Sequence, residues 1–205
     1  MGLRIGKEHR GMSESDARPW KPTPVQVKNA RNKRVPDVLA QNLDVVFCGI
    51  NPGLYSGAVG HHFARPGNRF WRALHASGFT DELLRPFEER RLLDYGCGIT
   101  NLVNRATAVA SELSDEELRR GRKNLARRIR RRAPLCVAVL GMGAYRTAFR
   151  EPDADVGPRE RRIGGSRLWL LPNPSGLNAH YQVPDLSVLF AELRRAVERW
   201  KKGQG

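Results

Sequence analysis

Three short apolar segments, separated by stretches with a helical pattern, constrain the fold of this chain most strongly. They cover residues 43–50, 135–140 and 167–171. Unbroken apolar runs of this length are typical of strands that are buried on both faces, as in a parallel sheet covered by helices. The first run ends at the turn sequence Asn-Pro-Gly of residues 51–53, and the third at Pro-Asn-Pro-Ser-Gly of residues 172–176.

Helices are expected between and after these strands. Their predicted ranges are 68–78, 115–132, 142–149 and 184–200. Ser114 and the acidic residues that follow it are typical of a helix N-terminus. This alternation predicts an α/β fold, a three-layer α/β/α sandwich with a central, mainly parallel sheet. Ligands of such folds bind at the carboxyl ends of the strands, where the two turn sequences are expected to meet.

The charge of the chain favours a polyanionic partner. Lysine and arginine number 36 against 21 acidic residues, a net charge of +15. Residues 1–34 show no regular apolar period and are expected to form a basic, disordered or extended arm, which either tracks DNA or is simply solvated. Residues 35–205 are expected to form one domain. No apolar run approaches the ~18 to 20 residues that cross a membrane, and the N-terminus has no signal-peptide pattern, so we expect a cytoplasmic protein without membrane contact. The charge favours association with DNA, and the size of the chain is compatible with a monomer.

Several reaction classes lack their sequence signatures. The chain has no G-x-x-x-x-G-K-[ST] phosphate loop, no zinc-deaminase pattern and no G-x-S-x-G nucleophile elbow. Between Arg34 and Arg122 there is no lysine, which disfavours a Schiff-base mechanism. The three cysteines are far apart in sequence and form no metal-binding pair. We therefore expect no metal and no cofactor.

Four short motifs occur in a fixed order along the chain. They are GINPGL at 49–54, GHHF at 60–63, GNRFW at 67–71 and NPSGL at 173–177. Together they closely resemble the mismatch-specific uracil-DNA glycosylase and thymine-DNA glycosylase family, over about residues 35–195. The resemblance implies a uracil-DNA glycosylase-like fold. It also implies a monofunctional enzyme of base excision repair that flips uracil, from G·U mispairs, or another damaged pyrimidine out of DNA and cleaves the N-glycosidic bond with water.

Two residues are candidates for the catalytic step. Asn51 matches the family residue that positions the attacking water. Its amide can orient a water but cannot accept a proton, and a missing general base typically costs about 10²- to 10⁴-fold, so a slow enzyme is expected. An asparagine chosen only for turn geometry is the alternative. Asp94 is a carboxylate that would serve as an additional base if the fold brings it to the pocket, and otherwise as a cap or ion-pair partner.

The resemblance also implies which residues contact the flipped base and which contact the rest of the DNA. Phe63 would stack on the flipped base, the backbone N–H of Ile50 would bind a uracil oxygen, and Asn173 would steady the departing base. The full set of expected base contacts is Ile50, Ser56, His61, Phe63 and Asn173. The expected DNA contacts are Ser175, Gly176, Leu177 and Asn178, with Leu177 as the wedge that fills the space of the flipped base. The basic helix at 115–132 is expected to contact DNA in part.

Two other functions remain open at this point. A noncatalytic nucleic-acid-binding protein would use the same basic surface, and the first motif contains no carboxylate. A hydrolase of free nucleosides would use similar pocket chemistry without a wedge. The sequence also leaves open which base is preferred and whether the partner is duplex or single-stranded DNA.

Overall fold

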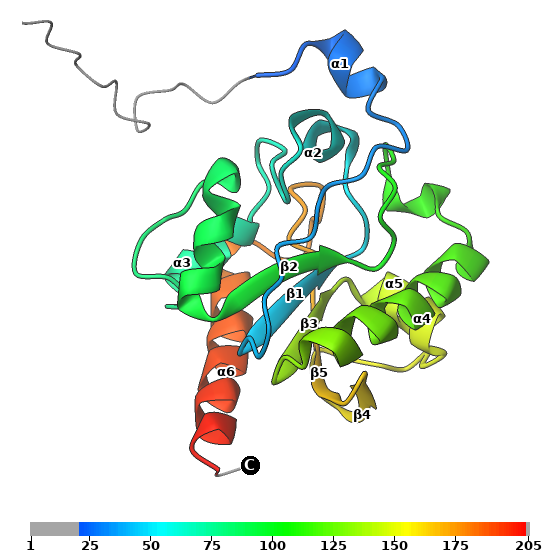
Figure 1. Cartoon of the computed structure of the whole chain (residues 1–205). Helices are drawn as coiled ribbons and strands as arrows, with labels where there is room; N and C mark the ends of the chain where they lie inside the picture. The colour runs from blue at the N-terminus through cyan, green and yellow to red at the C-terminus, as the bar shows by residue number, and fades with distance from the viewer. Residues whose placement is uncertain (1–20, 204–205) are drawn as a thin grey trace, which may run out of the picture.

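A central sheet of five strands organises the molecule, which the computed structural model describes over residues 21–203 (Figure 1). The strands lie in the order β2-β1-β3-β5-β4. The first four in this order run parallel, and only β4 is antiparallel to its neighbour β5. The bounds are Val45–Gly49 for β1, Cys97–Asn101 for β2, Cys136–Leu140 for β3, Gly157–Ile163 for β4 and Ser166–Leu171 for β5. The predicted, mainly parallel sheet is confirmed.

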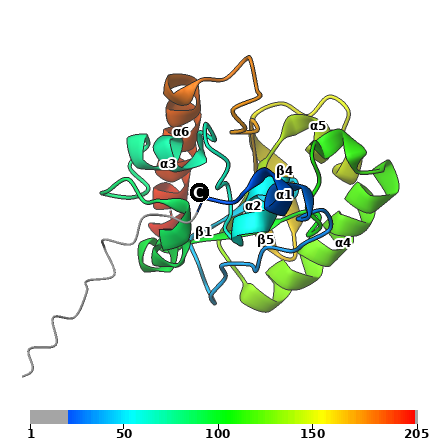
Figure 2. The same cartoon turned by 90° about the horizontal axis from the view of Figure 1, so that it is seen from above.

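Helices cover both faces of the sheet (Figures 1 and 2). The helices α3 (Phe70–Ala76) and α6 (Val183–Lys201) pack on one face, and α4 (Asp115–Arg132) and α5 (Met142–Phe149) on the other. Alternate side chains of each strand enter the two cores: Phe47 faces α3 and α6, whereas its neighbour Val46 faces α4 and α5. The three-layer α/β/α arrangement is therefore confirmed.

The predicted helices agree closely with the observed ones, but two strands were not predicted. Ser114 caps α4 as expected, because its side chain accepts from the N–H of Glu117. The strand β4 has the charged sequence GPRERRI, which suits an exposed edge and lacks an apolar run. A Gly164-Gly165 turn with positive φ at both residues joins it to β5. The strand β2 is short and contains glycine, threonine and asparagine.

The segment 21–34 is ordered, unlike the disordered or extended arm that was expected. It contains the helix α1 (Pro24–Lys28), which Thr23 caps. It is joined to the body by a hydrogen bond from the N–H of Asn32 to the Ala106 carbonyl (2.9 Å) and by an ion pair of Arg31 with Glu112. These partners lie far away in sequence, so periodicity within the arm did not indicate them. The rest of the predicted arm, residues 1–20, lies outside the described residues.

The remaining short helices belong to the connections. They are α2 (Leu54–Val59), η2 (Pro86–Tyr95) and η3 (Ala110–Glu112). Within residues 21–203, no helix combines the length and the apolar character needed to cross a membrane.

Candidate active site

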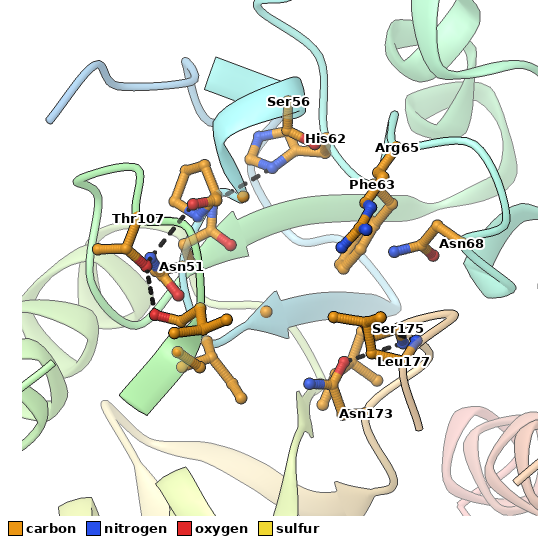
Figure 3. A pocket seen from close by; sticks show the side chains of 18 of the residues that line it. Asn51, Ser56, His62, Phe63, Arg65, Asn68, Thr107, Asn173, Ser175 and Leu177 are labelled. Carbon is orange, nitrogen blue, oxygen red and sulfur yellow. Dashed lines mark hydrogen bonds between the residues drawn. The ribbon is translucent and has the colours of Figure 1, made fainter. Parts of the chain in front are cut away.

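A pocket of about 340 Å³ opens at the carboxyl ends of four strands (Figure 3). Gly49 ends β1, Asn101 ends β2 and Leu140 ends β3, and all three line the pocket together with Asn173, which follows β5. The turns after the first and third predicted strands therefore meet at one site, as the parallel sheet required.

The side chain of Asn51 is held in one orientation by three acceptors. Its Nδ2 donates to the Thr107 hydroxyl (2.7 Å), to the Arg105 carbonyl (3.0 Å) and to the carbonyl of Pro52 (3.2 Å). Thr107 is buried and donates its only hydroxyl proton to the Val109 carbonyl (2.8 Å), so towards Asn51 it acts as an acceptor. The amide nitrogen must therefore face Thr107. This leaves Oδ1 of Asn51, half-buried in the wall of the pocket, as an acceptor without a partner among the described residues.

A second oriented amide belongs to Asn101. His62 is buried and its Nε2 lies 2.9 Å from the carbonyl of Pro36, which can only accept, so Nε2 carries the proton. Burial lowers the pKa of His62, with the charges of Glu89 and Asp37 acting in the opposite direction. In the neutral ring Nδ1 accepts from Nδ2 of Asn101 (3.3 Å). The oxygen of the Asn101 amide is left to face the pocket.

His61 was expected to bind the base, but its neighbour His62 is the histidine that lines the pocket. The His61 imidazole pairs with Glu89 (3.0 Å) and does not line the pocket, whereas His62 does. The same carboxylate of Glu89 accepts from the backbone N–H of His62 (2.7 Å) and so fixes both residues. Adjacent side chains point in different directions here, and the sequence alone did not tell which one faces inwards.

Phe63 provides an aromatic wall of the pocket. Its ring stacks on Phe70 with a centroid distance of 4.1 Å, and its backbone has a positive φ of 52°. Gly49 permits this packing, because a Cβ there would lie 3.3 Å from the Phe63 ring and 2.6 Å from Oδ1 of Asn101. A non-glycine residue with positive φ is uncommon and often marks a functional position.

The amide of Asn173 is oriented in the opposite sense to that of Asn51. Its Oδ1 accepts from the N–H of Ser175 (3.0 Å), which closes a tight turn. Its Nδ2 has no acceptor among the described residues, and the side chain lines the pocket (Figure 3). Asn178 supports the turn by donating its Nδ2 to the Asn173 carbonyl (2.9 Å).

The guanidinium of Arg69, in the motif at residues 67–71, holds the loop at residues 174–178. Arg69 donates through Nη1 to the carbonyls of Ser175 and Asn178, both at 2.8 Å, and its own N–H donates to Pro174 (2.9 Å). The backbone of Gly176 approaches Gly67 so closely that a Cβ would lie 2.6 Å from the Gly67 oxygen. The loop therefore has little freedom at its base.

The tip of this loop presents an apolar side chain to solvent. Leu177 is 65% exposed and stands at the rim of the pocket. Val109 also lines the pocket and is 47% exposed. Of the expected DNA contacts, Ser175, Leu177 and Asn178 line the pocket, while Gly176 lies beside it. Ile50 and Ser56 line it as well.

Asp94 is not brought to the pocket. It is exposed and lies in η2, before β2 begins at Cys97, whereas the pocket lies at the other end of that strand. A five-residue strand spans roughly 15 Å, too far for direct proton transfer. The expectation of a second catalytic base at this position is therefore wrong. Among residues 21–203, no group of three or more histidine, cysteine and acidic side chains is placed to hold a metal ion.

A family comparison gives this pocket its context. The model of the "Uracil DNA glycosylase superfamily" matches residues 36–198, most of the chain. The chain belongs to the uracil DNA glycosylase superfamily. The match spans all five strands and both Asn-Pro turns, so the pocket lies inside the family domain. Membership supports a DNA glycosylase role, a hydrolase activity and DNA as partner.

A solved structure has a similar fold. It is the solution NMR structure of a candidate uracil DNA glycosylase from Methanosarcina acetivorans, with a TM-score of 0.53 and 18% identity. The likeness covers 80% of this superfamily member and 98% of the other chain. At this identity the comparison concerns the fold.

Four residues of the site were missed by sequence reasoning. They are His62, Arg69, Asn101 and Thr107. Asn101 ends a strand, so predicting β2 would have placed it among the carboxyl-end residues. Thr107 acts through contacts with distant loops, and no local sequence pattern indicated it. Arg69 lies in the third motif, but the motif did not show that its guanidinium holds the loop at residues 175–178.

Proposed function

We propose that this protein is a monofunctional DNA glycosylase that excises uracil from G·U mispairs, and other mispaired or damaged pyrimidines, in base excision repair. The base flips into the pocket, and water attacks the N-glycosidic bond without a metal or cofactor. One observation carries the proposal: two amides of opposite orientation, Asn51 and Asn173, line the same pocket.

The two amides suit the charges of this reaction. Cleavage of the N-glycosidic bond develops positive charge on the sugar and negative charge on the departing base. Oδ1 of Asn51 accepts a hydrogen from the attacking water and directs its lone pair towards the sugar. Nδ2 of Asn173 donates to the base as negative charge builds there, which stabilises the transition state more than the ground state. Neither amide takes up a proton, so the proton that the water loses passes to solvent and the departing base anion is protonated from solvent, and the expected rate is modest.

The third amide favours a base with an imino proton. Oδ1 of Asn101 accepts from N3–H of uracil or thymine, whereas cytosine has an acceptor at that position. His62 keeps this oxygen facing the pocket because its neutral Nδ1 accepts the amide hydrogen. Phe63 stacks on the flipped base, a contact worth about 1 to 3 kcal/mol.

Leu177 fills the space that the extruded base leaves in the stack. Its side chain is apolar and exposed, and Arg69 fixes its loop next to the pocket. An apolar wedge of this kind offsets part of the unstacking cost of a few kcal/mol, and a mispaired base costs less to extrude than a paired one. A hydrolase of free nucleosides would not need such a wedge.

The test is single-turnover base release from duplexes that contain one G·U, A·U or G·T pair, and from single-stranded DNA with one uracil. We expect release from G·U, and a loss of at least about 10²-fold in Asn51→Ala with nearly unchanged DNA affinity. Asn29→Ala is the matched control, since Asn29 is exposed and lies outside the pocket.

Two results would contradict the proposal. Tight DNA binding without release from any of the four substrates would favour a noncatalytic binding protein. Equal release of a free nucleoside by wild type and Leu177→Ala, with none from DNA, would favour a nucleoside hydrolase.

A further inference from the structure

A second hollow lies on the α4 face of the sheet, separate from the base pocket. It is a groove of about 490 Å³ between α4 and the segment 102–105. Six arginines line it, against a single acidic residue, Glu117. The arginines of this groove, called the arginine groove below, are Arg34, Arg105, Arg120, Arg127, Arg128 and Arg131.

The helix α4 builds one wall of the arginine groove as a straight stripe. Arg120, Asn124, Arg127 and Arg131 are spaced four, three and four residues apart, so they follow one side of the helix. Gly121 lets this side approach the sheet, because a Cβ there would lie 2.5 Å from the Leu102 carbonyl oxygen. The stripe from residue 120 to residue 131 is about 16 Å long, at 1.5 Å per residue.

Three of the six arginines lie within ion-pair distance of a carboxylate, whereas the other three have none among the described residues. Glu117 is paired with Arg105, at 2.6 and 3.0 Å, and Arg128 lies 3.6 Å from Asp37. Arg120 is mainly exposed and lies 3.6 Å from Glu116. Within residues 21–203, Arg34, Arg127 and Arg131 have no carboxylate partner.

These unpaired guanidinium groups leave the groove with a surplus of positive charge on exposed, long side chains. A guanidinium presents a planar set of donors that matches phosphate oxygens. A 16 Å stripe is comparable with the rise of about five successive phosphates of one DNA strand, at about 3.4 Å each.

We propose that the arginine groove binds the phosphodiester backbone of DNA, outside the nucleotide that enters the base pocket. The groove and the pocket share one segment of chain: the side chain of Arg105 lines the groove, and its carbonyl accepts from Nδ2 of Asn51 in the pocket. A strand held in the groove therefore continues towards the base pocket. The groove proposal extends the proposed function and rests on it in one respect, namely that the polyanion is DNA.

The test compares two triple variants that remove the same charge from opposite faces. Arg120→Gln, Arg127→Gln and Arg131→Gln neutralise the wall of the groove, and glutamine preserves helix propensity. Arg195→Gln, Arg199→Gln and Lys202→Gln form the control. These residues are exposed and lie in or directly after α6, the helix that covers the other face of the sheet (Figure 2).

Equilibrium binding to an undamaged duplex is measured across a range of salt concentrations, with duplexes of about 10 and about 30 base pairs. The groove variant should bind the longer duplex about tenfold or more weakly. Its slope of log affinity against log salt should be shallower by about 2.7, at 0.9 for each phosphate that the variant no longer neutralises. Wild type should bind the longer duplex more tightly than the shorter one, and this difference in affinity should be smaller in the groove variant.

Equal losses in the two triple variants would overturn the proposal, because they would indicate a diffuse effect of net charge. An unchanged affinity and salt slope in the groove variant would overturn it as well. The binding experiment uses undamaged DNA, so it does not depend on base release. If wild type releases no base, the proposed function is contradicted, while the binding result still shows whether the arginine groove binds DNA.

Discussion

The two Asn-Pro turns of the pocket use the same residue pair for opposite purposes. In the first turn, Asn51-Pro52-Gly53, the side-chain amide of Asn51 donates its hydrogens to Thr107 and to backbone carbonyls, so its oxygen is free to accept in the pocket. In the second turn, Asn173-Pro174-Ser175, the side-chain oxygen of Asn173 accepts from a backbone N–H within the turn, so its amide nitrogen is free to donate in the pocket. The neighbours of an asparagine, and not the asparagine itself, decide whether it presents an acceptor or a donor.

This difference explains how a pocket that has no carboxylate among its described lining residues can still separate the two charges of base release. An acceptor on one side orients water, and a donor on the other stabilises the leaving base. Each orientation depends on a different supporting group, so each can be broken separately. The substitutions that follow go from the largest expected effect to the smallest.

Asn173→Asp should give the largest loss. The remaining oxygen can still accept from the Ser175 N–H, so the turn is kept, but the donor is replaced by a negative charge next to the departing base. Loss of one such donor typically costs about 10²- to 10³-fold. Single-turnover release from G·U measures it. Asn68→Asp is the control, since Asn68 also lines the pocket and accepts from the Phe70 N–H. Equal losses in both variants would indicate a general charge effect and remove Asn173 from its proposed role.

Thr107→Val tests the orientation of Asn51. Valine keeps the shape of threonine but lacks the acceptor for Nδ2, so the amide becomes free to turn. We expect release to fall by about 10²-fold, the cost of a small misplacement in an active site. Thr107→Ser should restore most of the rate because it keeps the hydroxyl. A valine variant as active as the serine variant would show that Thr107 does not orient Asn51.

Arg69→Ala loosens the second turn from outside. Its guanidinium holds the carbonyls of Ser175 and Asn178, so the wedge loop should gain freedom and extrude the base less well. We expect release from duplex G·U to fall about tenfold, and release from single-stranded uracil to change little. Arg90→Ala, which removes an exposed charge elsewhere, provides the control. A similar loss on single-stranded DNA would place the effect of Arg69 in the pocket and not in the wedge.

Much of this fold was predictable because the sheet is built from apolar runs. The strands β1, β3 and β5 and the helices α4, α5 and α6 carry patterns that burial imposes on a sequence. The edge strand β4 carries exposed charges and so has no such pattern. The short helix α1 has local signals, a capping box of Thr23 with Gln26 and a proline in its first turn, but it buries no side chain and so has no apolar period.

The site was predictable where it follows strand ends and not where it depends on loop packing. Asn51 and Asn173 lie in turns that directly follow apolar runs, and their roles were expected from the resemblance of their motifs to the glycosylase family. The choice between His61 and His62 depended on where the carboxylate of Glu89 lies, which is a long-range contact. Asp94 was misplaced because the chain passes through η2 before β2, at the end of the sheet opposite the pocket.

The third amide differs from the other two, because a titratable group orients it. Burial lowers the pKa of His62 from its ordinary value of 6.5, while Glu89 and Asp37 oppose the shift. Above pH 6.5 the ring is neutral in the folded and the unfolded chain, and its contribution to stability is complete. As the pH falls below that value, the unfolded chain takes up a proton that the folded chain resists. Stability is then lost at up to about 1.4 kcal/mol per pH unit until the folded-state pKa is reached.

Urea unfolding of wild type and His62→Gln at about pH 7.5 and about pH 5.5 measures this contribution. The variant should lose less stability than wild type between the two conditions, and His180→Gln, which removes an exposed histidine, should behave like wild type. Protonation also turns Nδ1 into a donor that faces the Asn101 amide nitrogen, so the amide reverses and presents NH₂ to the base. Release of uracil should therefore fall as the pH approaches the lowered folded-state pKa of His62, at the acid end of the range in which the stability is lost. If release is unchanged at a pH where the His62-dependent stability is already lost, the orientation of the Asn101 amide does not determine recognition of the base.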